Sequence, residues 1–262
     1  MESASEMHCG RTLLFLIGLA ALRAVCAPAL CGDDDSGLLQ ELGERRASLD
    51  LKIAENPQDV DLFSARGDVL FFLGEFEPAV RDYSRMVELN PALDSSHWRR
   101  GIAWFYAGRY ADAARQFERY HSFDNVDREN GIWRYLCQVK AHGVEKARAG
   151  LLKYEKDDRQ PFPDVYRLFA GDVEPEEILR RIATAKVSDE EREKRLFYAH
   201  LYIGLWHAVH DRPLQALPHL EQAVQNTWAP RAGYGPRYMW HVGRLQQQLL
   251  AQAHDAGTNR AE

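Results

Sequence analysis

Three histidines in one short stretch are the first candidates for chemistry. In FYAHLYIGLWHAVH, residues 197–210, His200 and His207 are seven residues apart and His210 follows three residues later. Imidazoles with these spacings on one helix could share a zinc ion. No cysteine or carboxylate in the stretch completes a ligand set, and histidines near a helix C-terminus interact favourably with the helix dipole. We therefore expect no metal and no cofactor.

A second candidate is the basic motif HWRR, His97 to Arg100. Two adjacent guanidinium groups could hold a carboxylate or a phosphate in a bidentate manner. Arginines that flank a tryptophan on a helix are more often solvated or stacked on a neighbour. We therefore expect both arginines to be solvated or stacked on a neighbour, and we keep recognition of an anion or a peptide terminus as the alternative.

Motifs of catalytic chemistry are absent from the sequence. It contains no Gly-x-Ser-x-Gly elbow, no His-Glu-x-x-His, no phosphate loop and no dinucleotide-binding glycine fingerprint. The carboxylates of GEFEP (74–78) and DNVDREN (124–130) fall in turns or at helix starts, where the helix dipole favours them. We predict no catalytic residue and no enzyme. The alternative is a hydrolase or metal-dependent enzyme built on the His- and Trp-rich helices 129–140 and 197–210.

Composition and charge narrow the class of partner. Of the 262 residues, 45% are hydrophobic and 27% are charged, so the chain can bury a core. Its formal net charge is −6 and its isoelectric point is about 5.9. Nucleic acid needs a concentrated basic face, so we expect no nucleic-acid partner.

The N-terminus has the layout of a secretory signal peptide. Arg11 precedes the apolar run TLLFLIGLAAL (12–22), and small residues follow at 27–29. We predict a signal peptide over 1–29, a short exposed linker over 30–36, and export to the periplasm or the exterior. A start at Met7 would remove two acidic residues. An uncleaved membrane anchor or an organelle-targeting peptide is the alternative location.

Cysteine usage agrees with export. Three of the four cysteines lie in or beside the predicted signal, which leaves Cys137 alone in the folded part. We expect Cys137 to be a buried thiol and keep a bridge to Cys31 as an alternative. Lipidation of Cys26 or Cys31 is a further alternative, and the membrane is a partner only through this N-terminal segment.

These candidates must be positioned by a repeated helical unit. Four pairs of similar residues are each separated by 34 positions: Gly67 and Gly101, Gly74 and Gly108, Ala79 and Ala113, Tyr83 and Phe117. In each copy one helix face precedes a glycine turn and a second face follows it. A two-helix hairpin cannot bury its apolar face alone, so copies must stack.

The pattern formed by residues 57–125 resembles the tetratricopeptide repeat (TPR) family. The residues in the family's positions are Phe63, Gly67, Leu70, Ala79, Tyr83, Met86 and Pro91, then Trp98, Gly101, Trp104, Ala113 and Phe117. The resemblance implies an all-α, right-handed superhelical solenoid of helix-turn-helix repeats over 37–255. The best repeats are 60–93 and 94–127.

The later part of the chain matches the repeat less closely. We predict degenerate repeat structure over 128–193, with a lid inserted at 153–193 as the alternative, and a further repeat over 195–228. Ser188 and Glu191 have the spacing of a capping box that opens the 189–209 helix. Residues 237–253 are predicted to form a capping helix, and 256–262 a disordered tail.

By the known geometry of the family, the first helices of the repeats line a concave groove. We predict a non-catalytic scaffold or adaptor that binds a peptide or partner protein there, with assembly of copies through the open ends as an alternative. The predicted groove residues are Asp68, Phe72, Trp98, Arg99, Ile102, Phe105, Trp133, Lys140, Tyr198 and Leu201.

Overall fold

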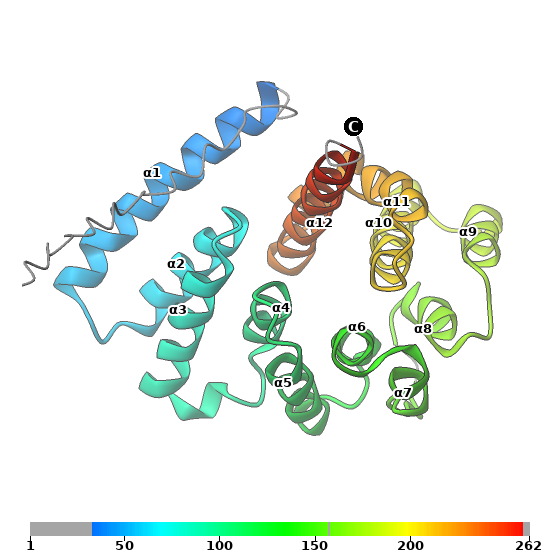
Figure 1. The fold of residues 1–262 in the computed structure, drawn as a ribbon, viewed down its shortest axis with the longest axis horizontal. Coiled ribbons are helices and arrows are strands. Elements are labelled where there is room, and N and C mark those ends of the chain that lie inside the picture. The colour runs from blue at the N-terminus through cyan, green and yellow to red at the C-terminus, as the bar shows by residue number, and fades with distance from the viewer. Residues whose placement is uncertain (1–32, 157, 259–262) are drawn as a thin grey trace, which may run out of the picture.

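The computed structural model describes residues 33–156 and 158–258, and every regular element among them is a helix. In chain order the helices are α1 (Asp33–Glu55), α2 (Val60–Phe72), α3 (Phe76–Leu89), η1 (Pro91–Leu93), α4 (Trp98–Tyr106), α5 (Tyr110–Phe123), α6 (Arg128–His142), α7 (Val144–Ala149), α8 (Phe162–Ala170), α9 (Pro175–Thr184), α10 (Asp189–Val209), α11 (Pro213–Gln225), η2 (Ala229–Arg231) and α12 (Tyr234–Thr258). Most consecutive helices pack on each other, and the series bends into an arc (Figure 1). The prediction of an all-helical chain is confirmed over these residues.

The hairpins α2–α3 and α4–α5 coincide with the two best predicted repeats. In the first, a Cβ added to Gly67 would lie 2.6 Å from Cε1 of Tyr83. In the second, a Cβ added to Gly101 would lie 2.7 Å from Cζ of Phe117. Both aromatic rings are fully buried. The 34-residue spacing therefore repeats one packing unit, in which glycine lets two helices approach and the ring fills the space beside it.

The turns of these hairpins also depend on glycine. Gly74 and Gly108 have φ of 78° and 75°, a left-handed conformation that disfavours residues with a Cβ. The α10–α11 hairpin repeats the close approach with different residues, because a Cβ on Gly204 would lie 2.8 Å from Cγ of Leu220. The predicted hairpin over 195–228 is thus helical, and its first helix has the predicted bounds, Asp189–Val209.

The segment from Gly143 to Ser188 departs from the repeat. Helix α7 has only six residues, and the described residues between it and α8, 150–156 and 158–161, form no helix. Helix α8 lies against α6 and α10, and α9 packs on α8 and α10. Both helices continue the arc and do not lie over its inner side (Figure 1). The Oγ of Ser188 accepts the Glu191 N–H at 3.2 Å, which confirms the predicted cap of α10.

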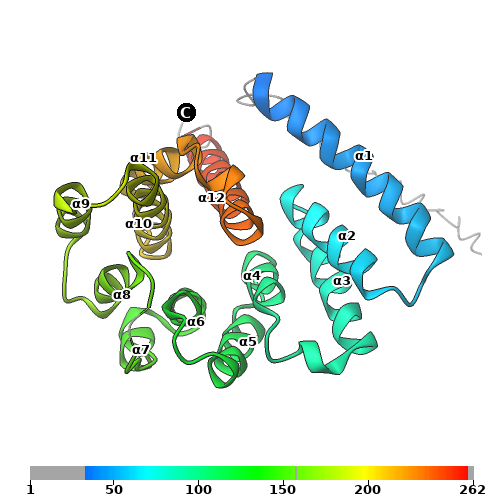
Figure 2. The ribbon, with the colours of Figure 1, turned by 180° about the vertical axis from the view of Figure 1, so that it is seen from behind.

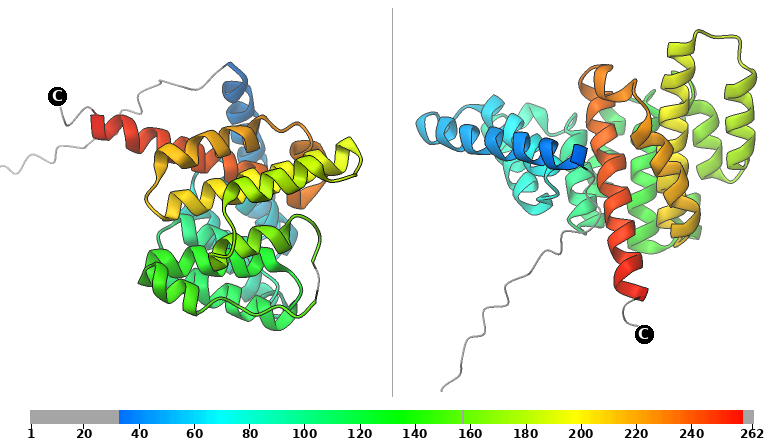
Figure 3. Two further views of the ribbon diagram at one scale, coloured as in Figure 1. Left: turned by 90° about the vertical axis from the view of Figure 1, so that its right-hand side faces the viewer. Right: turned by 90° about the horizontal axis from the view of Figure 1, so that it is seen from above.

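Helix α12 does more than cover the last repeat. It packs on α11, and it also reaches α2 at the other side of the arc. Tyr238 of α12 is fully buried and stacks on Phe71, with ring centroids 5.0 Å apart. Arg244 donates a hydrogen bond to the backbone carbonyl of Phe72. The views from behind and from above show α12 between α2–α4 and α10–α11 (Figure 2; Figure 3, right).

Three predicted boundaries need correction or fall outside the described residues. Helix α1 begins at Asp33, so residues 33–36 are helical and do not form part of a linker; acidic residues suit the first turn of a helix. Helix α12 extends to Thr258, so residues 256–258 are helical too. The predicted signal peptide (1–29), Cys26, Cys31 and residues 259–262 lie outside the described residues. Cys137 is free and buried.

Within the described ranges, none of the helices combines the length and the apolar composition that crossing a bilayer requires.

Candidate functional site

Several predicted groove residues contact the chain's own last helix. Phe72 stacks on His241 of α12, with ring centroids 3.8 Å apart. Asp68 accepts hydrogen bonds from Arg99 at 2.7 Å and from the hydroxyl of Tyr234 at 2.8 Å. The inner surface that we expected to face a partner is therefore occupied by α12 near α2 and the start of α4.

The other predicted groove residues have three different environments. Three are core residues: Ile102, Phe105 and Leu201. Lys140 is exposed near the end of α6. The last three line a single pocket: Trp98, Trp133 and Tyr198. The structure thus brings together only a subset of the predicted groove.

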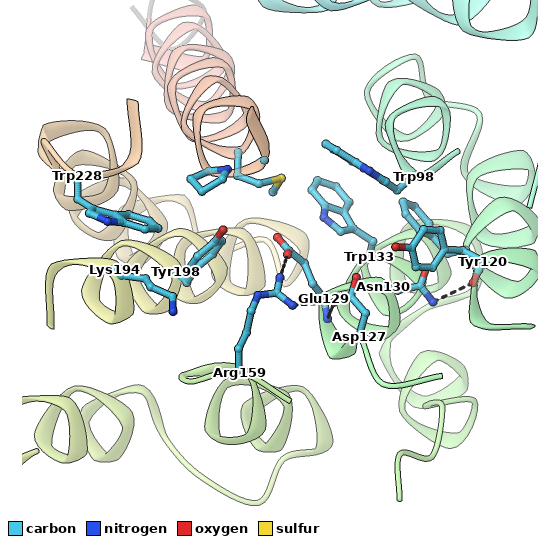
Figure 4. A pocket seen from close by; sticks show the side chains of 14 residues that line it. Trp98, Tyr120, Asp127, Glu129, Asn130, Trp133, Arg159, Lys194, Tyr198 and Trp228 are labelled. Carbon is cyan, nitrogen blue, oxygen red and sulfur yellow. Dashed lines mark hydrogen bonds and ion pairs between the residues drawn. The ribbon is translucent and has the colours of Figure 1, made fainter. Parts of the chain in front are cut away.

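This pocket, called here the aromatic pocket, has a volume of about 470 Å³ (Figure 4). Its walls come from parts of the chain that are far apart in the sequence. Trp98 is the first residue of α4, Trp133 lies in α6, Tyr198 lies in α10, and Trp228 lies between α11 and η2. Met239 of α12 also lines it. The pocket exists because α12 closes a side that an open arc would leave to solvent.

Charged groups form one side of the pocket around a single arginine. The guanidinium of Arg159 lies 2.5 Å from a carboxylate oxygen of Glu129 and 3.3 Å from oxygens of both Asp127 and Asp158. The hydroxyl of Tyr202 donates to the other oxygen of Glu129. With one cation among three carboxylates, this cluster, called here the carboxylate floor, has a net negative charge when the acids are ionised. Asp158 belongs to the cluster but does not line the pocket. Lys194 is a second cation that lines the pocket, and it pairs with Glu191 of its own helix at 3.1 Å.

The start of α6 positions the carboxylate floor. Asp127 caps this helix, because its side chain accepts the backbone N–H of Glu129 at 3.1 Å. Glu129 therefore lies in the first helical turn, beside the cap. The backbone N–H of Arg128 donates to Asp158 at 2.8 Å, which fastens the irregular loop to α6. That contact places Arg159 opposite both α6 acids.

Burial changes the acid–base behaviour of the floor. The Glu129 side chain is 14% exposed, and its burial raises the pKa of its carboxyl from 4.5 to about 7. Arg159 opposes this rise in the pKa, and the charge of Asp127 adds to it. Burial also raises the pKa of Asp127. Glu129 can therefore gain or lose a proton near neutral pH.

Several of these groups were missed by sequence reasoning. Asp127 and Glu129 were interpreted as acids that a helix dipole favours. The cap confirms that role for Asp127, which also lies beside Arg159. Arg159 lies in a loop without hydrophobic periodicity, and Trp228 lies in a connection. One signal was available: DNVDREN places three acids directly before Trp133, on a helix already chosen for the enzyme alternative.

The histidines of α10 lie beside another histidine, and no set of carboxylate ligands lies with them in the described part of the chain. Nδ1 of His200 lies 3.0 Å from Nδ1 of His219 in α11, and the ring of His207 stacks on His219 at 5.9 Å. Burial lowers the pKa of His200 and of His207 to about 4, so both are neutral at pH 7. No group of three or more metal-ligating side chains within the described residues is placed to hold a metal ion.

The arginines of HWRR bind groups of their own chain. Arg99 pairs with Asp68 at 2.7 Å. Arg100, whose side chain is 6% exposed, pairs with Asp94 and donates to the side-chain oxygen of Gln116 at 2.6 Å. Both guanidinium groups are thus already partnered, which leaves little capacity for an external anion.

The chain matches no protein-family model. Its resemblance to tetratricopeptide repeats therefore rests on residue spacing and on the helical hairpins. Function has to be argued from the aromatic pocket itself.

Proposed function

We propose that the protein is a non-catalytic adaptor that binds a peptide segment of a partner protein, and that the aromatic pocket receives one basic side chain of that segment. The observation that carries this proposal is the combination of three tryptophan walls with the negatively charged floor. In the same proposal the arc is a right-handed, TPR-like superhelix whose inner side is partly filled by α12.

The chemistry of the walls favours a cation. Indole and phenol rings attract ammonium and guanidinium groups through the negative face of the ring, most strongly where water is excluded. The pocket already holds one cation in this way: the guanidinium of Arg159 lies 4.2 Å from the ring centroid of Phe162 and 5.9 Å from that of Tyr198. A lysine or arginine side chain from a partner would add ion pairing with Asp127 and Glu129.

The size of the pocket suits one long side chain with its flanking backbone. A volume of about 470 Å³ lies within the range of small-molecule sites and is too small for a partner helix. The acidic floor and the net charge of −6 also argue against nucleic acid as the partner. Export of the protein remains a separate proposal that rests on residues 1–29 alone.

A matched pair of substitutions tests the site. Asp127 and Asp59 both cap a helix through their side chains, and asparagine caps almost as well as aspartate. Asp127→Asn should therefore remove charge from the pocket with little loss of stability. Asp59→Asn makes the same chemical change at the exposed start of α2, outside the pocket. Only the first change should weaken binding of a cationic ligand.

The probe is a pentapeptide amide, glycines around a central lysine, compared with the same peptide carrying norleucine. Binding is followed by the indole N–H signals of the protein in NMR titrations. We expect the lysine peptide alone to shift the pocket tryptophans, and Asp127→Asn to weaken it by about fivefold or more. Equal binding of both peptides, or equal weakening by Asp59→Asn, would rule out a cation-selective pocket.

One observation favours acid–base catalysis as a second candidate. The helices 129–140 and 197–210 of the enzyme alternative do meet in the pocket, and Glu129 has a pKa of about 7 there, which suits a general acid or base. Mass spectrometry of the bound peptide distinguishes the two. A change of mass that disappears in Glu129→Gln supports catalysis, whereas an unchanged peptide supports the adaptor.

A further inference from the structure

A second pocket lies between the α6–α7 turn and the α10–α11 turn, and we call it the basic pocket. Its volume is about 650 Å³. Three of its lining side chains are cations: Lys140, Arg148 and Arg212. Asp211 is the one acidic residue among those that line it in the described part of the chain. The lining therefore has an excess of two positive charges, opposite in sign to the carboxylate floor.

These three cations lack carboxylate partners. Lys140, Arg148 and Arg212 are exposed, whereas the half-buried arginines Arg66 and Arg99 each lie 2.7 Å from a carboxylate oxygen. Across residues 36–156 and 158–253, no ion pair joins Lys140, Arg148 or Arg212 to an acid. A cluster of like charges is unfavourable unless something neutralises it. The single negative charge of Asp211 does not balance the three positive charges that line the basic pocket.

Arg148 is held in a defined position. A Cβ on Gly171 would lie 3.2 Å from Cζ of Arg148, so the guanidinium fits against a residue without a side chain. Gly171 ends α8 with φ of 87°, a conformation that glycine adopts readily. The charge of Arg148 also acts on the neighbouring Tyr135 and His210. The side chain of Arg148 is exposed, and its guanidinium lies against the end of α8 at the edge of the pocket.

Aromatic groups hold the second arginine. The guanidinium of Arg212 lies 5.3 Å from the ring centroid of Trp206. The ring of His210 donates from Nδ1 to the backbone carbonyl of Trp206 at 2.6 Å, so its Nε2 accepts from the Tyr135 hydroxyl at 3.2 Å. Burial lowers the pKa of His210, so this imidazole is neutral and adds no charge of its own. The pocket thus combines several cationic donors, none of which forms an ion pair with a carboxylate in the described part of the chain.

We propose that the basic pocket binds a phosphate dianion, carried either by a small molecule or by a phosphorylated side chain of a partner. Two negative charges match the excess of two positive charges in the lining. Two guanidinium groups offer paired N–H donors that fit phosphate oxygens, and Lys140 adds a point charge. This site is independent of the aromatic pocket, so the two proposals can fail separately.

The test measures binding of inorganic phosphate to the full chain by calorimetry at low ionic strength, where charge screening is weak. We expect Arg148→Gln and Arg212→Gln each to weaken binding by about tenfold, and Arg212→Lys to restore part of it. Arg81→Gln, a change at an exposed arginine of α3, is the matched control. Thermal unfolding of every variant identifies any that fail to fold. If Arg148→Gln fails to fold, the comparison of Arg212→Gln with Arg212→Lys still tests the site.

A second arm compares a phosphoserine peptide with its unphosphorylated form. Tighter binding of the phosphopeptide than of inorganic phosphate assigns the site to a protein partner, and the reverse assigns it to a small phosphorylated molecule. Either outcome supports a phosphate site. Absence of phosphate binding, or binding that Arg148→Gln and Arg212→Gln leave unchanged, would overturn it.

Discussion

Two parts of the arc are packed in different ways: the hairpins α2–α3 and α4–α5, and the irregular segment from Gly143 to Ser188. In the hairpins, a glycine on one helix meets an aromatic ring on the other, and the fit leaves no space: Gly67 meets Tyr83 and Gly101 meets Phe117. In the irregular segment, a six-residue helix and a long connection replace the second helix of a repeat. The consequence is that two cavities border this part of the chain.

Because of this difference, we expect stability and ligand binding to depend on different parts of the chain. The irregular segment provides Arg159 to the aromatic pocket and Arg148 to the basic pocket. The regular hairpins contribute mainly packed walls, such as Trp98 and Phe117. Substitutions in the hairpins should therefore change the free energy of unfolding, whereas substitutions of the charged pocket residues should change binding. The predictions below test that separation.

The largest effect is expected where α12 fastens to the regular hairpins. Tyr238→Ala removes a fully buried ring that contacts Phe71, Phe72 and Trp98, and it should reduce the free energy of unfolding by about 3–5 kcal/mol. Leu249→Ala, on the same helix at 39% exposure, should cost about 1 kcal/mol or less. Denaturant unfolding measures both. Equal losses would mean that α12 is not anchored at Tyr238.

A smaller effect is expected at a repeat glycine. Gly101→Ala places a Cβ against the buried ring of Phe117, and the overpacking should destabilise the protein by about 1–3 kcal/mol. Gly43→Ala is the control, because a Cβ there meets nothing within 4 Å in α1. That change should stabilise the protein by about 0.5–1 kcal/mol. A stabilised Gly101→Ala variant would contradict the packing unit.

An effect of about the same size as that of Gly101→Ala concerns Glu129, and it depends on pH. Because the folded state raises the Glu129 pKa from 4.5 to about 7, the folded protein holds this proton more tightly than the unfolded chain. The stabilisation that results is complete below the unfolded pKa and is lost as pH rises through the folded value. Glutamine does not titrate, so Glu129→Gln should gain stability relative to the parent as pH rises from about 5 to 8, by on the order of 1–3 kcal/mol.

The control for this prediction is Glu41→Gln, the same change at an exposed position of α1. Thermal and denaturant unfolding at several pH values measure the difference between each variant and the parent. The difference should change more with pH for Glu129→Gln than for Glu41→Gln. A constant difference for Glu129→Gln would show that Glu129 does not titrate in this range.

The regular part of the fold is predictable because its determinants are local. A helix face, a turn glycine such as Gly74 and a cap such as Ser188 act through residues a few positions apart, so spacing alone indicates them. The bounds of α10 were predicted correctly for this reason. The start of α1 and the end of α12 were predicted less well.

The site was harder to predict because it depends on which surfaces meet. An amphipathic pattern shows that α12 buries one face, but it does not show that Tyr238 contacts Phe71, far earlier in the chain. Arg159 owes its role to the contact of Asp158 with the start of α6. Trp98, Trp133 and Tyr198 were predicted as binding residues, and their place in a closed pocket follows only from the position of α12.

The return of α12 to the beginning of the arc also bears on how the molecule folds. The hydroxyls of Tyr83 and Tyr238 meet across 155 positions of sequence, and Arg244 reaches the backbone of Phe72 across 172. In a linear array of repeats, each unit contacts only its neighbours and the ends can melt by themselves. Here the loss of α12 also removes contacts with α2, so we expect unfolding to be more cooperative than in such an array. Closure also raises the contact order, which makes folding slower than for hairpins that form alone.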